Sequence, residues 1–410
     1  MNILLVSLLV WVGLLLLLEA GLRLIFGFGN PLLYLADPDM GYLLAPNQYT
    51  KRLGNRIVIN EYSMRSPTMT KKRPPSTLRV LLLGDSVANG AWWTDQEQTL
   101  SARMSAHLKR PMAEGWGGTL NRNTPFERVE VLNASANSWG PRNELAYLQR
   151  FGAFEAQAIV LLLNTDDLFA TEPTSDPVGR TPNYPNRKPL CALAEVYTRY
   201  LSPQLTRIGM KAVTPKQEGV VAQPTGKFVL RSPLPPTDSN NTQSLVSDPL
   251  DSGPERSYAN DVSAWTPEAS TGITPLSGLA QPPTEASQNV SLESNLDAIR
   301  QIHSLVTLAG AEFILAMTPL LRETGEPGPR DYELKARELL TQLTQKESIL
   351  YLDFLPLFNH WETPQTLYRD HIHLSPSGNE RVSEAITRSL QQVLRESATF
   401  TTGEESMSHS

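Results

Sequence analysis

The chain has 410 residues, a formal net charge of −6 at pH 7 and one cysteine, Cys191. A single cysteine excludes an intrachain disulfide, and an acidic chain without a basic stripe argues against a nucleic-acid-binding protein. The sequence also carries no P-loop, no dinucleotide-binding glycine motif and no cluster of metal-ligating residues, so it indicates no cofactor and no metal site.

The first 28 residues predict a membrane anchor. Residues 3–18 are apolar with two exceptions, and the apolar character continues to residue 28 around Glu19 and Arg23, which can pair at i,i+4. This length is enough to cross a bilayer. A cleavable signal peptide is the alternative, but a charged N-terminal region and an Ala-x-Ala-like cleavage site are missing. We therefore expect a single-pass membrane protein, anchored through residues 1–28.

Residues 29–75 lead from the anchor to the first part of a domain, residues 76–170. The lead-in contains one short predicted strand, residues 57–59. In the domain, continuous apolar runs alternate with stretches that suit helices. Such runs are typical of strands buried on both faces of a parallel sheet. The predicted strands are residues 78–83, 128–132 and 158–163, and the predicted helices are residues 98–109 and 144–151.

Residues 171–289 interrupt this alternation with a composition rich in Pro, Ser, Thr, Gly, Asn and Gln. Such a segment buries too little apolar surface to offset its ordering entropy, so we expect a mostly disordered insertion with one helix at residues 190–210. We interpret it as a surface insertion, with a lid or a cell-wall spacer as functional alternatives. The last residues, 398–410, are predicted to form a disordered tail.

Residues 290–397 supply the second part of the domain. The two parts together contain about five strands that alternate with helices, which predicts an α/β fold with a parallel sheet between helical layers. The predicted strands here are residues 312–317 and 349–354, and the predicted helices are residues 292–309, 332–346 and 379–396.

Two motifs at opposite ends of the domain carry candidate catalytic residues. Ser86 follows a Gly-Asp pair at the carboxyl end of the first predicted strand, where open α/β sheets place reactive groups. Asp370 precedes His373 by three residues on the loop into the last predicted helix, so it can orient the imidazole toward a serine. The neighbouring His371 has the wrong spacing from Asp370 and is assigned to the loop.

These motifs resemble those of the SGNH, or GDSL-type, hydrolase family, and the anchor and lead-in fit its membrane-bound bacterial members. The resemblance implies a flavodoxin-like three-layer α/β/α sandwich and a reaction that needs no cofactor. It also implies a catalytic triad in which Ser86 is the nucleophile, His373 the general base and Asp370 the group that holds the base in its tautomer.

The resemblance further implies an oxyanion hole, and here the chain departs from the family pattern. Backbone N–H groups of Ser86 and Ser138 would contribute, although the family has a glycine at the position of Ser138. A backbone donor survives this change if the turn does not require a positive φ. The side-chain donor is either Asn164 or absent, because Asp166 holds the family's asparagine position and a carboxylate only accepts hydrogen bonds.

We therefore predict a membrane-anchored serine esterase that cleaves carboxylic esters through an acyl-serine intermediate. The anchor favours an envelope substrate, either acylated polysaccharide or lipid, and a catalytic domain outside the cytoplasm. Basic residues downstream of the anchor would argue for the opposite orientation, but only Arg23 is close to the membrane. The alternatives are an O-acyltransferase with the same triad and an inactive scaffold of the same fold, the latter because the two middle motifs are degenerate.

Overall fold

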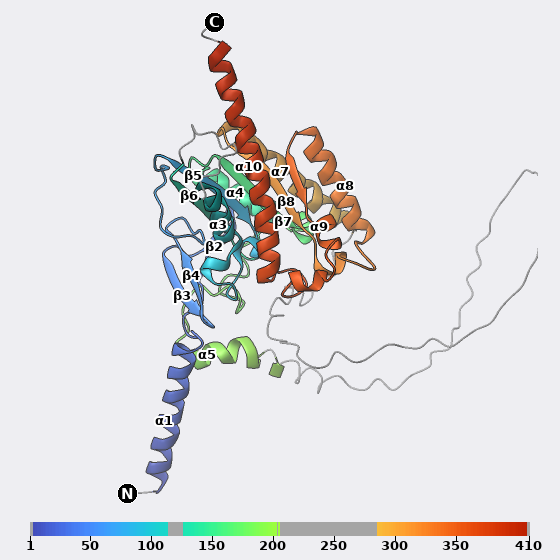
Figure 1. Ribbon diagram of the computed structural model, residues 1–410. Coiled ribbons are helices and arrows are strands. Elements are labelled where there is room, and N and C mark those ends of the chain that lie inside the picture. The colour runs from blue at the N-terminus through green and yellow to red at the C-terminus, as the bar shows by residue number, and fades with distance from the viewer. Residues whose placement is uncertain (1–2, 114–125, 203, 206–284, 408–410) are drawn as a thin grey trace, which may run out of the picture.

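The computed structural model describes residues 3–113, 126–202, 204–205 and 285–407 (Figure 1). Its centre is a five-stranded sheet in the order β6-β5-β7-β8-β9, in which every neighbouring pair is parallel. The predicted parallel sheet of about five strands is therefore confirmed. The strands are β5 (Thr77–Gly84), β6 (Arg128–Ser135), β7 (Ala158–Asn164), β8 (Glu312–Thr318) and β9 (Leu350–Asp353).

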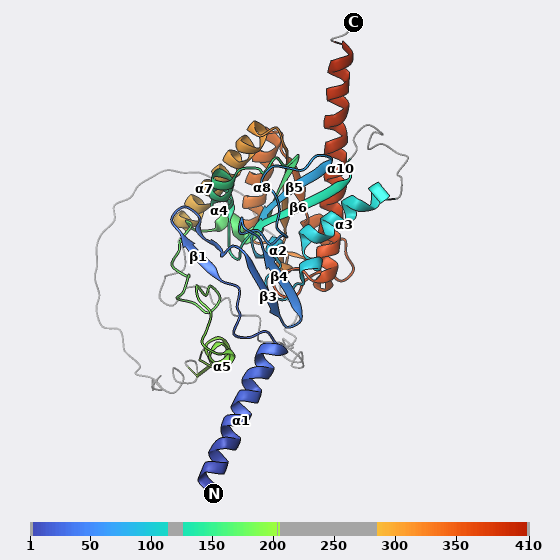
Figure 2. The same cartoon turned by 90° about the vertical axis from the view of Figure 1, so that its left-hand side faces the viewer.

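Helices cover both faces of this sheet, as Figures 1 and 2 show. Successive residues of β5 point to opposite faces, so that Leu82 packs in one hydrophobic cluster and Leu81 in the other. This arrangement is the expected three-layer α/β/α sandwich. The layer on the Leu82 side contains α3 (Leu100–Ala113) and α10 (Pro376–Met407), and the layer on the Leu81 side contains α4 (Pro141–Phe151), α7 (Glu285–Leu308) and α8 (Asp331–Lys346).

Two helices extend beyond their predicted ends. α7 begins at Glu285 and so includes the last residues of the predicted insertion. α10 continues to Met407 because no proline follows residue 396 to end it. Shorter elements connect the layers: α2 (Ser86–Asn89), α9 (Leu355–Asn359), η1 (Gln96–Gln98), η2 (Thr165–Phe169), η4 (Leu321–Glu323) and η5 (Pro364–Leu367).

The lead-in segment forms two antiparallel hairpins where the sequence predicts one short strand. The hairpins are β1 (Tyr34–Asp37) with β2 (Gly41–Leu44), and β3 (Gln48–Arg52) with β4 (Asn55–Ile59). The segment is part of the domain core, since Met40, Ile57 and Met64 are fully buried in the hydrophobic cluster of the α4 layer. The buried Arg65 guanidinium donates to the carbonyl of Asn89 at 2.7 Å and to those of Ala91 and Thr94. The lead-in therefore supports the chain just after α2.

The described beginning of the insertion, residues 171–202, packs on the lead-in. The Tyr184 ring lies 5.1 Å from that of Tyr34 and 5.0 Å from that of Tyr42, and the Glu195 carboxylate pairs with Arg52. The predicted helix at residues 190–210 is represented by α5 (Ala192–Val196) and the π-helical η3 (Tyr197–Leu201). Most of the expected disordered stretch, residues 206–284, lies outside the described residues.

The apolar N-terminal stretch forms α1 (Ile3–Leu24), which extends away from the domain (Figures 1 and 2). None of its residues is buried, and its mean hydropathy of 2.6 over a membrane-spanning window suits a bilayer, although a signal sequence has the same properties. At its C-terminal end, Glu19 accepts hydrogen bonds from the backbone N–H groups of Ala192 at 2.7 Å and Leu193 at 3.0 Å. α1 and α5 are therefore joined directly.

Candidate active site

The turn after β5 places Ser86 at the carboxyl edge of the sheet. Ser86 is the first residue of α2, and the Asp85 carboxylate caps this helix by accepting from the Val87 N–H at 2.8 Å. The preceding Gly84 is required by close packing, because a Cβ there would lie 2.7 Å from the carbonyl oxygen of Leu162 and 2.8 Å from the Cβ of Ala88. The Gly-Asp-Ser sequence thus fixes the position of the serine hydroxyl.

The loop between η5 and α10 brings Asp370 and His373 to Ser86. The loop is closed by a bridge between Tyr368 and Leu374. Asp370 Oδ2 lies 2.8 Å from His373 Nδ1, and His373 Nε2 lies 3.0 Å from Ser86 Oγ. The three residues predicted from the sequence therefore form one continuous hydrogen-bonded chain.

The hydrogen bonds of this loop hold Asp370 as a carboxylate. Burial disfavours its charge, but the His373 side chain and the backbone N–H groups of His373 and Ile372 outweigh burial and lower the pKa of Asp370 to about 2. The neighbouring His371 points elsewhere: its side chain is 67% exposed and its Nδ1 is 4.0 Å from Asp370. Of the two histidines, only His373 bonds to the serine.

The loop after β6 contains Ser138 in the left-handed region, with φ of +56°. The turn therefore does require a positive φ, and the exchange of the family's glycine for serine has a cost. A residue with a Cβ is less stable in this conformation by roughly 1–2 kcal/mol. The Ser138 hydroxyl accepts a hydrogen bond from the Tyr184 hydroxyl at 2.9 Å. Its side chain is thus held by the start of the insertion, not by Ser86, Asp370 or His373.

The amide of Asn164, at the end of β7, makes its hydrogen bonds inside the fold. Asn164 Nδ2 donates to Asp85 Oδ2 and to Asp167 Oδ2, both at 2.9 Å. A primary amide has two N–H groups, so an oxyanion would have to compete with these carboxylates for either of them. The other candidate, Asp166, is exposed to solvent. Desolvation by the surrounding protein atoms still raises the pKa of its carboxyl, and the nearby Arg322 acts in the opposite direction.

A buried group of carboxyls behind Ser86 was not predicted. Asp85 Oδ2 lies 3.2 Å from Ser86 Oγ and is joined to Asp167 through Asn164. Glu144, in the first turn of α4, is fully buried, and neither of its side-chain oxygens has a hydrogen-bond partner among the described residues. Burial and the charge of Asp85 raise the pKa of Glu144 well above its usual value, and burial similarly raises that of Asp167. This environment favours a protonated Glu144.

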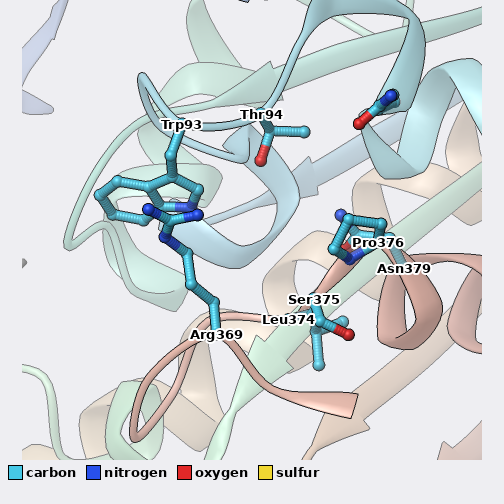
Figure 3. Close-up of a pocket in the computed structure, with 8 residues that line it drawn as sticks. Trp93, Thr94, Arg369, Leu374, Ser375, Pro376 and Asn379 are labelled. Atoms are coloured by element: carbon cyan, nitrogen blue, oxygen red, sulfur yellow. The ribbon is translucent and has the colours of Figure 1, made fainter. Parts of the chain in front are cut away.

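Trp93 and Arg369 also border the triad, and the sequence analysis missed both. The Trp93 ring lies 4.7 Å from the His373 imidazole. The Arg369 guanidinium lies 5.2 Å from the same indole, and Figure 3 shows these two side chains together. The available signals were weak: an adjacent tryptophan pair shortly after the serine motif, and a basic residue immediately before Asp370. These side chains line a pocket of about 130 Å³ beside His373.

No family model matches the chain, and no curated protein matches it. Among solved structures, it is similar to an acetylxylan esterase from Geobacillus stearothermophilus, with 10% identity, a TM-score of 0.38 and coverage of 78% of this chain and 95% of that chain. It is also similar to a lipase/acylhydrolase from Enterococcus faecalis, with 12% identity, a TM-score of 0.36 and coverage of 77% and 96%. A third is a Desulfitobacterium hafniense protein described as lipolytic and of the G-D-S-L family, with 12% identity, a TM-score of 0.35 and coverage of 76% and 98%.

Proposed function

We propose that the protein is a serine esterase of the SGNH type, which cleaves carboxylic esters through an acyl-serine intermediate. The observation that carries the proposal is the unbroken chain from Asp370 through His373 to Ser86 Oγ, with separations of 2.8 and 3.0 Å. These distances lie within the reach that nucleophilic catalysis requires between nucleophile, base and orienting carboxylate.

The geometry supports a two-step reaction. Ser86 Oγ attacks the ester carbonyl while its proton passes to His373 Nε2, and the alcohol leaves with that proton as the acyl-serine forms. A water molecule then attacks the acyl group, gives its proton to the same nitrogen, and Ser86 is regenerated with release of the acid. Asp370, ionised because of its low pKa, keeps the Nδ1 proton of His373 in place throughout.

Stabilisation of the oxyanion is assigned to the backbone N–H groups of Ser86 and Ser138, with Asn164 as the side-chain donor. This part of the proposal comes from the resemblance of the motifs. The bonds from Asn164 to Asp85 and Asp167 favour a second candidate, a catalytically inactive scaffold, because they occupy the N–H groups of the expected side-chain donor.

The proposed setting is a membrane. α1 would be a single-pass anchor, the lead-in and the two parts of the domain would form one body outside the cytoplasm, and the region between residues 171 and 289 would be an insertion at its surface. The length of α1 and the absence of buried residues in it support the anchor. Acylated envelope polysaccharides or lipids are the substrates that an anchored esterase would reach.

A fluorophosphonate probe on the full chain in detergent tests the activity. We expect labelling of the wild type, its loss in Ser86→Ala and its retention in Ser377→Ala, a matched change of an exposed serine near the same loop. Absence of labelling in the wild type would favour the scaffold, and labelling of Ser86→Ala would place the nucleophile elsewhere. Acyl product on an added sugar acceptor, formed at the expense of hydrolysis, would identify an O-acyltransferase.

A further inference from the structure

The pocket beside His373 has walls from two distant parts of the chain. Trp93 and Thr94 come from the segment after α2, Arg369 comes from the loop that carries the base, and Asn379 comes from the first turn of α10 (Figure 3). Because the Trp93 ring contacts the imidazole, a group seated against Trp93 is also next to the proton acceptor of the reaction.

Arg369 brings an unneutralised positive charge to this pocket. The side chain is exposed, and its guanidinium stacks on the Trp93 indole but forms no ion pair with any residue that the structure describes. Elsewhere in the domain the guanidinium of Arg337, for example, bonds to the carboxylates of Glu323 and Asp353. Stacking on an indole orients the guanidinium fork and leaves its N–H groups available for an oxyanion.

Asn379 adds an unsatisfied acceptor. The residue is 4% exposed, and its side-chain oxygen has no hydrogen-bond partner within the described part of the chain. A buried polar atom without a partner is costly, so this oxygen is better satisfied when a polar ligand occupies the pocket that Asn379 lines. The charge of Arg369 therefore indicates an anionic occupant. The Asn379 oxygen only accepts hydrogen bonds, so it calls for a donor on the same ligand or a bridging water, not for the anionic group itself.

We propose that this pocket selects esters whose alcohol portion carries an oxyanion group, a carboxylate or a phosphate, and that Arg369 binds that group. The inference rests on the proposed esterase function and adds a substrate class to it. Arg369 is a specificity-determining residue in this scheme, and its effect is expected on substrate binding more than on the chemical step.

Three aryl acetates test the selection: 4-acetoxybenzoate, 4-acetoxyphenyl phosphate and the neutral 4-acetoxybenzamide. Each variant is compared with the wild type on the same ester, so that differences in leaving-group reactivity cancel. Arg369→Gln should lower kcat/KM for the anionic esters by about tenfold or more, mainly through KM, and leave the neutral ester within about twofold. Arg369→Lys should restore part of the loss, and added salt should reduce the wild-type preference. Whichever anionic ester loses more kcat/KM in Arg369→Gln identifies the anionic group, carboxylate or phosphate, that Arg369 prefers.

Arg381 offers a matched control, because its guanidinium also stacks on an indole, that of Trp361 at 4.7 Å, without lining the pocket. Arg381→Gln should leave kcat/KM at its wild-type value for all three esters. If Arg369→Gln changes kcat/KM equally for all three esters, the inference is overturned. Hydrolysis that still depends on Ser86 would then leave the esterase function intact.

If no ester is hydrolysed, the esterase proposal fails, and titration calorimetry with 4-hydroxybenzoate and 4-hydroxyphenyl phosphate tests the pocket alone. Binding that weakens at least about tenfold in Arg369→Gln supports an anion site. Absence of binding, or equal binding to both proteins, overturns it.

Discussion

The loops at the two ends of the domain differ from the two loops in its middle in how they hold the side chains of the proposed active site. The end loops direct Ser86, His373 and Asp370 toward one another, within hydrogen-bond distance. In the middle loops, the exposed Ser138 hydroxyl bonds to Tyr184, and the buried Asn164 amide bonds to Asp85 and Asp167. The groups of the proposed proton transfer are thus preorganised, whereas the side-chain amide expected to stabilise charge is held by structural contacts.

The largest expected effect tests the end loops. His373→Ala should lower the rate of hydrolysis of a short-chain aryl acetate by a factor on the order of 10²–10⁴, because it removes the general base. His371→Ala should leave most of the activity, since the His371 side chain is largely exposed and its Nδ1 lies as far as 4.0 Å from the Asp370 carboxylate. Equal losses in the two variants, measured as kcat, would leave the assignment of the base without support.

The next effect tests the loop after β7. If Asn164 gives up one of its carboxylate bonds to the oxyanion, Asn164→Ala should lower kcat by a factor on the order of 10²–10³. It should also lower the free energy of unfolding by about 1–3 kcal/mol, because Asp85 and Asp167 lose a donor in a buried place. Urea denaturation and kcat are measured on the same preparation. Destabilisation without a change in kcat would make Asn164 purely structural.

Asp166→Asn is the partner measurement. Little change in kcat is expected if Asn164 serves the oxyanion. An increase in kcat would mean instead that the Asp166 carboxylate faces the developing charge and opposes it.

The smallest effect concerns the loop after β6. Ser138→Gly should be more stable than Ser138→Ala by about 1 kcal/mol, since the two differ only by a Cβ at positive φ. Ser348, at φ of +55°, gives a control outside the site, where the glycine and alanine variants should differ by a similar amount. If Ser138 contributes its backbone N–H, both of its variants should keep kcat. A large fall in kcat with Ser138→Ala would show that the hydroxyl takes part.

The sequence predicts the central elements well because they are continuous and local. The run at residues 78–83 lies within β5, since an apolar run without alternation has few other ways to be buried. The lead-in was less predictable: Tyr34 and Tyr42 are buried against Tyr184, which lies in the insertion and far along the chain. Short hairpins of this kind depend on partners that no local pattern reveals.

The same division holds for the site. Ser86, Asp370 and His373 are visible in the sequence because each belongs to a compact motif with defined spacing. The bonds of Asn164 depend on Asp85, which lies at the end of another strand and becomes its neighbour only through the pairing of β5 with β7. The contact of Arg369 with Trp93 likewise joins two loops separated by most of the domain. Spacing along the chain carries no information about such pairs.

The buried Glu144 makes a proton a structural component of the domain. Its pKa in the folded protein is raised well above the value of 4.5 that applies to an ordinary glutamate, chiefly by burial, so folding takes up a proton from solution at pH values between the unfolded and the folded pKa. The resulting stabilisation is fully present below the unfolded pKa and is lost as the pH rises through the folded pKa. Between these values each pH unit removes about 1.4 kcal/mol from the free energy of unfolding.

In Glu144→Gln this contribution to the pH dependence of the free energy of unfolding should be absent. The same pH dependence in the variant and the wild type, measured by denaturation between pH 5 and 8, would contradict it. Through Glu144, the domain that holds Ser86 therefore loses stability as its surroundings become more alkaline.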